Sequence, residues 1–391
     1  MIEVHATARH FLGMPASRFL KEYWQKKPLL IRNAFANFQT PLQPEDLAGL
    51  ACEEAALSRI VVHDREHDRW SLRTGPFAEE EFPGMPDHDW TLLVQDVDKW
   101  DPDVAALISR FDFLPRWRMD DVMVSFAATG GSVGAHVDQY DVFLLQAKGE
   151  RRWQIDDRAN PPLEFRDDVE LKLLREFSPS HEWVLEPGDV LYLPPGVPHN
   201  GVAENPCLTF SFGMRAPSAS ELMGDYIDTL IADADESIRY QDPDLAPAGD
   251  VHEIDAKAMA RVVEALNVLR MNDPDKLGDW FGRFITTYRA AGEVAASPEP
   301  RSRVELEWDL EHGAPLHRHP FSRLAWRRRA QAASLFCSGL QFDLPIKDAQ
   351  RLAAAELVDA ALYSGLSEAG REAVNALAQA GHYQFGMDED G

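Results

Sequence analysis

One stretch of the chain, residues 130–199, constrains the possible folds more than any other part. It contains His136-Val137-Asp138, and because side chains alternate along an extended strand, the imidazole and the carboxylate are expected on one face. A short strand, Val190–Leu193, is followed by the bend Pro194-Pro195-Gly196, and His199 lies just beyond it. Two histidines and one carboxylate fill one face of an octahedron and leave three positions open, as expected of non-haem Fe(II) oxygenases.

The same three residues allow a simpler interpretation, in which His136 and His199 are partly buried histidines and Asp138 caps a turn. A His-x-Asp tripeptide alone would favour that interpretation, because such tripeptides are common. Here Gly188-Asp189 is followed by four strand-like residues and by Pro-x-Gly-x-x-His, a combination specific to double-stranded β-helix barrels. We therefore predict that these three residues are catalytic and bind a metal ion.

Length and composition indicate a globular protein, with room in 391 residues for two or three domains. There is no apolar run of about eighteen residues to span a bilayer and no secretory signal, so we expect no membrane association and a cytoplasmic location. Three widely spaced cysteines argue against a disulfide framework or a thiolate metal site. The net charge of −26 repels nucleic acid and attracts basic polypeptides, although solubility alone would also explain it.

Repeated short strands predict the central fold. Residues 1 to about 100 indicate a mixed α/β region whose strands flank and lengthen a sheet. From Met119 to Arg215, short strands are separated by Gly, Pro and Asp turns, a pattern typical of a sandwich or barrel. In the first of these strands, alternation places Val122 and Val124 on one face and Asp121, Met123 and Ser125 on the other.

Several motifs resemble those of the bacterial ribosomal oxygenases. They are Phe19-x-x-x-Tyr23-Trp24-x-Lys26-Lys27-Pro28-Leu29, Gly134-x-His136-x-Asp138-x-Tyr140-Asp141-Val142-Phe143, Gly149-x-Arg151-Arg152-Trp153, the Pro-Gly-Asp to Pro-Pro-Gly-x-Pro-His stretch, and Gly213-x-Arg215-Ala216-Pro217. That family, of the YcfD or RoxA type, consists of JmjC-type 2-oxoglutarate oxygenases that hydroxylate an arginine of a large-subunit ribosomal protein. The resemblance is spread over most of the chain.

The resemblance implies a mainly β double-stranded β-helix (JmjC- or cupin-like) barrel with flanking helices, then a helical dimerisation segment and a C-terminal winged helix. The corresponding ranges are 1–216, 217–291 and 303–391. Helical periodicity over 221–232, 255–271 and 276–290 agrees with this order. A homodimer would bury the apolar faces of these helices, but packing on the barrel of the same chain would do so equally.

The C-terminal region carries fewer signals. Val304–Leu310 is expected to form a strand, and residues 347–355 and 367–380 are expected to form helices. The basic run Arg327-Arg328-Arg329 is expected on a solvated helix face. Acidic residues throughout the region argue against direct DNA binding.

A 2-oxoglutarate oxygenase must hold the distal carboxylate of that co-substrate with a cation. Arg151 shares a strand face with Trp153 and Ile155, which suggests that its face is the interior one, and the resemblance also places the basic anchor there. A structural salt bridge is the alternative role. Related sequences carry a helper serine where this chain has Ala127, so Ser125 and Thr129 are the remaining candidates for a helper hydroxyl.

The resemblance also implies a pocket for the target side chain. Tyr140 and Met123 would sandwich an aliphatic arginine stem, while Asp121 and Ser211 would accept hydrogen bonds from the guanidinium. The alternatives are core packing for Tyr140 and Met123 and a strand-end turn for Asp121.

These inferences lead to one functional hypothesis: an Fe(II)- and 2-oxoglutarate-dependent dioxygenase of the protein arginine 3-hydroxylase type that acts on a basic ribosomal protein. One alternative is a JmjC oxygenase that acts on histidine of a ribosomal protein or on RNA. Another is a non-catalytic cupin-like protein that binds a metal or small molecule.

Overall fold

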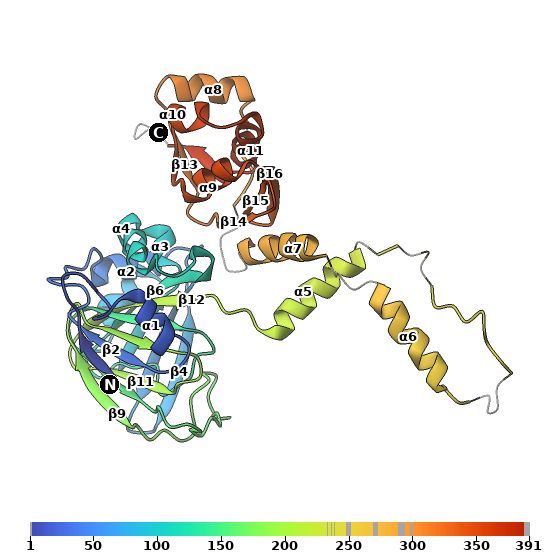
Figure 1. Cartoon of the computed structure of the whole chain (residues 1–391). Coiled ribbons are helices and arrows are strands. Elements are labelled where there is room, and N and C mark those ends of the chain that lie inside the picture. Colours follow the sequence, from blue (N-terminus) through green and yellow to red (C-terminus); the bar gives the residue numbers. More distant parts are fainter. Residues whose placement is uncertain are drawn as a thin grey trace. The chain divides into compact units, whose positions relative to one another are not determined.

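The computed structural model divides into two compact units, residues 1–216 and the part of the chain that begins at Pro217 (Figure 1). It describes residues 2–232, 234, 235, 237, 239–247, 252–268, 273–287, 294–297 and 300–386. Within these residues, every helix falls short of the length and apolarity needed to cross a bilayer.

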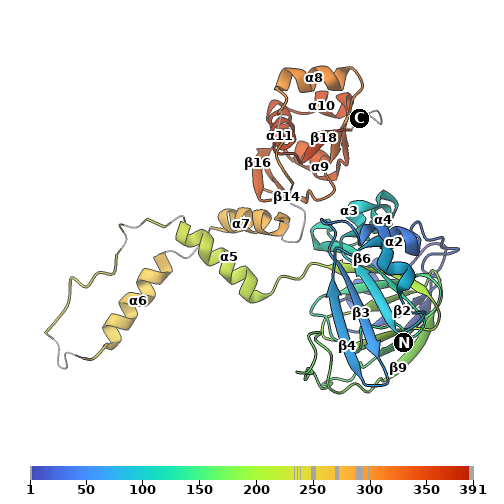
Figure 2. The ribbon, with the colours of Figure 1, turned by 180° about the vertical axis from the view of Figure 1, so that it is seen from behind.

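A nine-stranded sheet forms most of the first unit, and the predicted N-terminal strands do lengthen it. Its order is β1-β2-β10-β7-β12-β6-β5-β3-β4, and every pair except β1–β2 is antiparallel; Figure 2 shows the β3–β4 end. The strands are β1 (Glu3–His5), β2 (Leu29–Arg32), β3 (Ser58–Asp64), β4 (Arg69–Thr74), β5 (Trp90–Val94), β6 (Met119–Ala127), β7 (Val142–Lys148), β10 (Val190–Leu193) and β12 (Cys207–Met214).

A second, three-stranded sheet packs against this large sheet. Its order is β11 (His199–Ala203), β8 (Arg151–Ile155) and β9 (His181–Leu185). Leu144 and Leu191 of the large sheet form one buried cluster with Trp153, Ile155 and Leu185 of the small sheet. Two antiparallel sheets packed face to face in this way form the predicted double-stranded β-helix barrel.

The outer face of the large sheet is covered by short helices. They are α1 (Ala16–Glu22), α2 (Pro44–Leu50), α3 (Val97–Trp100) and α4 (Pro102–Leu107), with 3₁₀ turns at Glu79–Gly84, Ile108–Phe111 and Arg116–Arg118. Val122 and Val124 of β6 lie in the same core cluster as Phe19 and Leu47 of these helices. Since side chains alternate along β6, the opposite face, with Ser125, is left to line the barrel interior.

The second unit contains three helices and a small α/β fold. The helices are α5 (Ala219–Ala232), α6 (Ala256–Val268) and α7 (Pro274–Thr286). The α/β fold has α8 (Arg303–Glu311), α9 (Ile346–Ala354), α10 (Ala360–Ser364), α11 (Glu368–Gln379) and the sheets β17 (Leu357–Val358)–β13 (Leu316–Arg318)–β18 (Tyr383–Phe385) and β14 (Leu324–Arg328)–β15 (Ala333–Cys337)–β16 (Leu340–Leu344). Trp280 and Phe284 of α7 form a cluster with Tyr226 of α5, and Gly282 lets α7 approach Phe336 of β15.

Two predictions for the second unit are wrong. The segment expected to be a strand, Val304–Leu310, lies in helix α8, which begins with a capping box between Ser302 and Glu305. The Arg327-Arg328-Arg329 run is not on a helix, because β14 contains its first two residues. The predicted helices 255–271 and 276–290 correspond to α6 and α7, although residues 269–271 and 288–290 lie outside the described part of the chain.

Candidate active site

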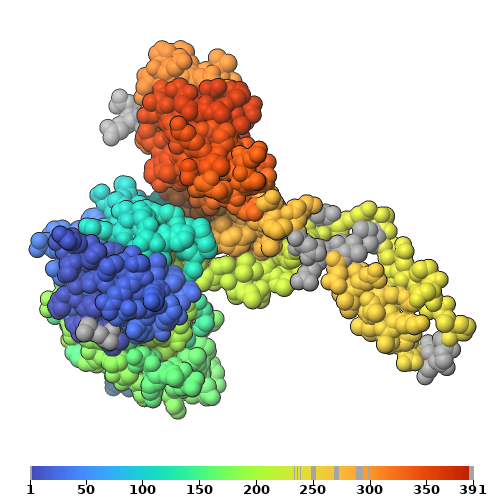
Figure 3. Space-filling view, in the orientation of Figure 1, coloured from blue at the N-terminus to red at the C-terminus, as the bar shows by residue number. Residues whose placement is uncertain are grey.

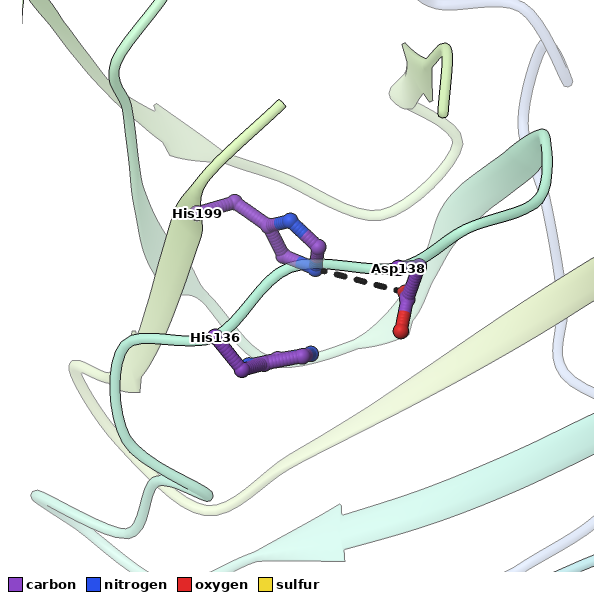
Figure 4. A group of neighbouring side chains, drawn as sticks. All are labelled: His136, Asp138 and His199. Atoms are coloured by element: carbon purple, nitrogen blue, oxygen red, sulfur yellow. Dashed lines mark ion pairs between the residues drawn. The ribbon is translucent and has the colours of Figure 1, made fainter. Parts of the chain in front are cut away.

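The three predicted metal ligands lie together inside the barrel. His136, Asp138 and His199 each offer one ligand atom, and these atoms all lie within 4.8 Å of one another. In Figure 4 both imidazoles point toward the carboxylate, and 3.6 Å separates His199 Nε2 from Asp138 Oδ2. In the part of the chain that the structure describes, no other three His, Cys, Asp or Glu residues are arranged in this way.

Backbone pairing brings the two halves of this site together. His136 and His199 form an isolated antiparallel bridge, in which each backbone N–H donates to the other's carbonyl, at 3.0 and 2.9 Å. The Gly196 N–H donates to the Asp138 carbonyl at 2.8 Å and so ties the bend after β10 to the same segment. Two segments about sixty residues apart are thereby fixed with their functional side chains facing one another.

Hydrogen bonds also fix the tautomers of both imidazoles. His136 Nδ1 donates to the Gly134 carbonyl and His199 Nδ1 donates to the Val197 carbonyl, each at 2.9 Å. A carbonyl can only accept, so the proton of each neutral ring lies on Nδ1 and the Nε2 lone pair faces the site. This is the form in which histidine binds a metal ion.

The electrostatics of the site suit a cation. Burial lowers the pKa of His199 well below its ordinary value, and the proximity of His136 lowers it further, so the ring is neutral. Burial raises the pKa of Asp138, whereas His136 and a hydrogen bond from Tyr140 act in the opposite direction. A bound cation would favour the ionised carboxylate and remove this conflict.

Arg151 of β8 points into the same interior and is 3% exposed. Its Nη1 donates to Ser125 Oγ at 3.3 Å and to Thr209 Oγ1 at 3.4 Å, and its Nη2 donates to the Gly201 carbonyl at 3.2 Å. Its Nε is buried and has no hydrogen-bond partner among the described residues. Within the same residues, no carboxylate lies within ion-pair distance of the guanidinium. Burial lowers the pKa of Arg151, whereas the proximity of Cys207 acts in the opposite direction. The guanidinium also lies over the Trp153 ring, 5.0 Å from its centroid.

The neighbours of Arg151 agree only in part with the predicted helper hydroxyls. Ser125 contacts the guanidinium, but Thr129 is exposed and accounts for none of the hydrogen bonds that Arg151 makes. Thr209, which the sequence did not single out, contacts it instead. Gly201 is needed beside it, because a Cβ there would lie 2.7 Å from Arg151 Nε. Arg152, on the opposite face of β8, pairs with acidic residues at the surface.

The predicted pocket residues also lie close to one another. Met123 and Ser211 are directly paired across β6 and β12. A Cβ built on Gly213 would lie 3.1 Å from Asp121 Oδ1 and 4.0 Å from the Tyr140 ring, so both side chains border the same glycine. Tyr140 is 42% exposed, which places its ring between the site and the surface.

Sequence reasoning missed Asp96, which lies two residues after the end of β5. Asp96 is buried in a left-handed conformation, and its backbone N–H donates to Asp121 Oδ2 at 3.3 Å. Burial, followed by the charges of Asp96, Asp120 and Asp98, raises the pKa of Asp121 to about 7. The acidic run after β5 was visible in the sequence, but only the pairing of β5 with β6 places it beside Asp121.

The fold and the site define the class of protein as a JmjC-type barrel with a winged helix. Residues 106–222 match the sequence family of the JmjC domain, and residues 269–384 match that of the ROXA-like winged helix. The ribosomal protein uL16 3-hydroxylase of Escherichia coli is 36% identical over 300 residues, which are 77% of this chain and 79% of that protein. A probable ribosomal oxygenase of Haemophilus influenzae is 40% identical over 228 residues, 58% of this chain and 54% of that protein.

Solved structures agree with these sequence relationships. An X-ray structure of Escherichia coli YcfD has a TM-score of 0.86 and 32% identity, and the alignment covers 96% of this chain and 99% of that one. A structure of YcfD in complex with cobalt and 2-oxoglutarate has a TM-score of 0.83 with the same identity and coverage. The chain therefore belongs to the ribosomal oxygenase family, and the resemblance seen in its sequence motifs is confirmed.

Proposed function

We propose that this protein is an Fe(II)- and 2-oxoglutarate-dependent hydroxylase of a ribosomal protein and that its target is an arginine side chain. The observation that carries the proposal is the combination, in one barrel interior, of a two-histidine, one-carboxylate triad with a buried arginine that has only neutral hydrogen-bond acceptors.

The triad fits an iron(II) ion. His136, Asp138 and His199 would bind it, because both Nε2 lone pairs and one carboxylate converge and each imidazole is held from behind by a carbonyl. When bound, iron(II) supplies the oxygen chemistry by which a C–H bond is hydroxylated while 2-oxoglutarate becomes succinate and carbon dioxide. The protein contributes placement of the reactants and exclusion of water.

Arg151 fits the distal carboxylate of 2-oxoglutarate. An arginine that is 3% exposed and lacks an acidic partner among the described residues carries a charge that no carboxylate of those residues balances. Burying such a charge is strongly unfavourable unless a counter-charge joins it. A carboxylate ligand is that counter-charge, and the planar guanidinium can bind it through two hydrogen bonds.

The pocket at Asp121 fits a cationic target. Asp121, supported by the nearby charge of Asp96, would accept hydrogen bonds from a guanidinium, with Ser211 as a second acceptor. Met123 and Tyr140 would then hold the aliphatic stem. Imidazole substrates are less favoured because a neutral ring does not compensate two carboxylates, and the net charge of −26 opposes RNA.

The name of the Escherichia coli relative supports a ribosomal protein of the uL16 type as substrate. The test is to incubate the full-length protein with Fe(II), 2-oxoglutarate, air and large-subunit ribosomal proteins, and then to locate any added oxygen by mass spectrometry. We expect one added oxygen on one arginine, no added oxygen with the His136→Ala variant, and much less of the product with Arg151→Met at limiting 2-oxoglutarate. Metal and 2-oxoglutarate binding without oxygen transfer would instead favour a non-catalytic binding protein. A ribosomal substrate would also place the enzyme in the cytoplasm.

We further propose that residues 1–216 form the catalytic domain, residues 217–291 a dimerisation segment and residues 303–391 the winged helix. Apolar side chains repeat along exposed faces of two helices: Met223, Ile227 and Ile231 in α5, and Met259, Val262, Val263 and Leu266 in α6. Figure 3 shows the surface of α6 in yellow-orange. Stripes of this spacing ordinarily pack on another apolar surface, and a second copy of the chain would supply one.

Light scattering coupled to size exclusion tests the dimer. We expect the wild-type protein to have twice the mass of one chain and the double variant Ile231→Glu, Val263→Glu to have the mass of one chain. The matched control is Asp228→Lys, which changes charge on α5 without touching the apolar stripe. A wild-type mass of one chain would exclude the dimer and leave the catalytic proposal unaffected.

A further inference from the structure

The hydrogen bonds behind Arg151 form a chain of buried polar groups across three strands of the large sheet. Ser125 of β6, Thr209 of β12 and Gln146 of β7 are direct cross-strand neighbours, so their side chains share the face that lines the barrel interior. Their exposed fractions are 4%, 1% and 0%. Buried polar side chains in a row of this kind need partners, and the partners they have determine the direction of each hydrogen bond.

Gln146 sets the direction of the chain. Its Nε2 lies 3.0 Å from the Lys148 carbonyl and 3.2 Å from the Gly149 carbonyl, and both of these oxygens can only accept. The amide NH₂ group must therefore face the two carbonyls, which turns Gln146 Oε1 toward Thr209. Oε1 is also only an acceptor, so across the 3.2 Å between them the Thr209 hydroxyl must donate.

Thr209 then presents only lone pairs to Arg151. With its single proton committed to Gln146, its oxygen accepts from Arg151 Nη1 at 3.4 Å. The guanidinium is held in place by this oxygen, by Ser125 Oγ and by the Gly201 carbonyl, all of them neutral. An acidic residue in the same position would hold the guanidinium equally well, but it would compensate the charge needed for a ligand.

Ser125 differs from Thr209 in this respect. Its oxygen also accepts from Arg151, but the acceptor available to its own proton, the Thr209 carbonyl, is 3.5 Å away, at the outer limit of a hydrogen bond. The Ser125 proton can turn to a better acceptor when one arrives. A ligand carboxylate bound to Arg151 would be such an acceptor.

We propose that Gln146, acting through Thr209, positions Arg151 for the distal carboxylate of 2-oxoglutarate, and that Ser125 is the hydroxyl that donates to this carboxylate. The inference rests on the proposed function and extends it to two positioning residues on other strands, Gln146 of β7 and Thr209 of β12.

The test measures binding of 2-oxoglutarate by calorimetry, without oxygen, to the full-length protein loaded with Mn(II). Thr209→Val has nearly the same shape as the wild type without the hydroxyl, and Gln146→Met removes the acceptor. We expect each to raise the Kd for 2-oxoglutarate about 5- to 20-fold. Thr209→Ser keeps the hydroxyl, so its Kd should be within about twofold of the wild-type value. Ser125→Ala should raise the Kd at least as much as Thr209→Val. The affinity for Mn(II) should be unchanged in all four.

A double variant separates a positioning chain from independent effects. If Gln146 acts through Thr209, as proposed, the combination Gln146→Met, Thr209→Val should bind 2-oxoglutarate about as tightly as Thr209→Val alone. The matched control is Thr286→Val, which removes an equally buried hydroxyl, hydrogen-bonded to the Gly282 carbonyl of α7, and should leave the Kd unchanged. Thermal melting shows whether each variant is folded. If Thr209→Val does not fold, Thr209→Ser still tests this position.

Two results would overturn the positioning chain while the proposed function stands: a folded Thr209→Val protein that binds 2-oxoglutarate like the wild type, or effects that multiply in the double variant. A wild-type protein that binds Mn(II) but no 2-oxoglutarate would instead refute the proposed function and this inference with it.

Discussion

Arg151 of the barrel and two arginines of the winged helix differ in the partners of their guanidinium groups. In the barrel, Arg151 is almost fully buried and its hydrogen bonds go to two hydroxyls and a carbonyl. In the winged helix, Arg327 donates to Asp275 at 2.7 Å, and Arg329 forms a close pair with Asp279 and lies 3.5 Å from Asp343. The first arginine keeps its charge available, whereas the other two have theirs compensated by neighbouring carboxylates.

The partners of an arginine distinguish a structural role from a functional one in this chain. Arginines that pair with carboxylates of α7 and β16 hold elements together, and such contacts satisfy both partners. A buried cation among neutral acceptors destabilises the folded protein, so it is expected only where a ligand uses it. Removing the metal ligands or Arg151 should therefore impair activity and spare stability, and removing the paired arginines of the winged helix should do the reverse.

The largest effect is expected at the triad. His199→Ala removes a buried imidazole whose Nε2 faces Asp138, and we expect no detectable hydroxylation because the metal loses a ligand. The comparison is His382→Ala in the winged helix, where an equally buried imidazole is hydrogen-bonded to Ser322 at 2.9 Å. There we expect hydroxylation to persist and the melting temperature to fall by several degrees. Peptide mass spectrometry and melting curves measure both. Loss of hydroxylation in His382→Ala, at a temperature where this variant is folded, would contradict a purely structural role for polar groups of the winged helix.

The next effect is expected at Arg151. Arg151→Met should raise the Kd for 2-oxoglutarate about 10- to 100-fold, because a charge-assisted hydrogen-bonded pair contributes about 1.5–3 kcal/mol. The melting temperature should stay the same or rise, because an uncompensated buried charge is removed. Arg152→Met is the matched control on the same strand: its side chain pairs with Glu182 and Glu204 near the surface, and it should leave the Kd unchanged. Clear destabilisation of Arg151→Met with unchanged affinity would make Arg151 a structural residue.

The sequence predicted the parts of the site that are written in short motifs. His136, Asp138 and His199 follow from spacing and bend residues, and Arg151 follows from alternation along β8, where Trp153 and Ile155 share its buried face. Thr209 and Gln146 could not be found in this way. Thr209 contacts Arg151, and Gln146 contacts Thr209 through the register of β12 with β6 and β7. Sequence patterns do not specify the register between distant strands.

Helix α8 shows a different kind of failure. Val304, Leu306, Trp308 and Leu310 alternate with polar residues, which is the pattern of a half-buried strand. The helix buries only Leu306 and Leu310, spaced four residues apart, and leaves Val304 76% and Trp308 58% exposed. The capping sequence Ser302-x-x-Glu305 was the signal that could have decided the question. The capping box that starts the helix is here a better indicator of structure than the alternation of apolar and polar residues.

A moderate effect is expected at the acidic pocket around Asp121. Here a change of pH, in place of a substitution, removes the charge of the carboxyl. The pKa of Asp121 is about 7 in the folded protein, so below this pH the carboxyl is protonated and a cationic side chain loses its partner. We expect kcat/KM for the peptide to fall up to about tenfold per pH unit below 7, and Asp121→Asn to lack this inflection. A wild-type profile without an inflection near pH 7, or the same inflection in Asp121→Asn, would assign the acidic pocket to another role.

The same carboxyl gives a stability prediction whose sign follows from linkage. Its ordinary pKa is 3.8, so between about pH 4 and pH 7 the folded protein binds the proton more tightly than the unfolded chain. The free energy of unfolding therefore falls as the pH rises through this window. Asp121→Asn should lack this fall and melt higher than the wild type at pH 8, while losing peptide affinity. Denaturant titrations of both proteins at pH 5 and pH 8 measure the difference.

The smallest effect is expected from the ion pairs of the winged helix. Arg327→Met and Arg329→Met should each lower the free energy of unfolding by about 0.5–1 kcal/mol, because partly exposed pairs contribute little. The loss for Arg329 should be the larger, since its close partner Asp279 is 15% exposed. The nearer partner of Arg327, Asp275, is 60% exposed, and Asp279 is 3.8 Å from Arg327. Neither substitution should alter the Kd for 2-oxoglutarate, which calorimetry at a temperature well below melting would show. A changed Kd in a folded protein would mean that charges in the second unit influence the barrel, and the division between structural and functional arginines would then have to be redrawn.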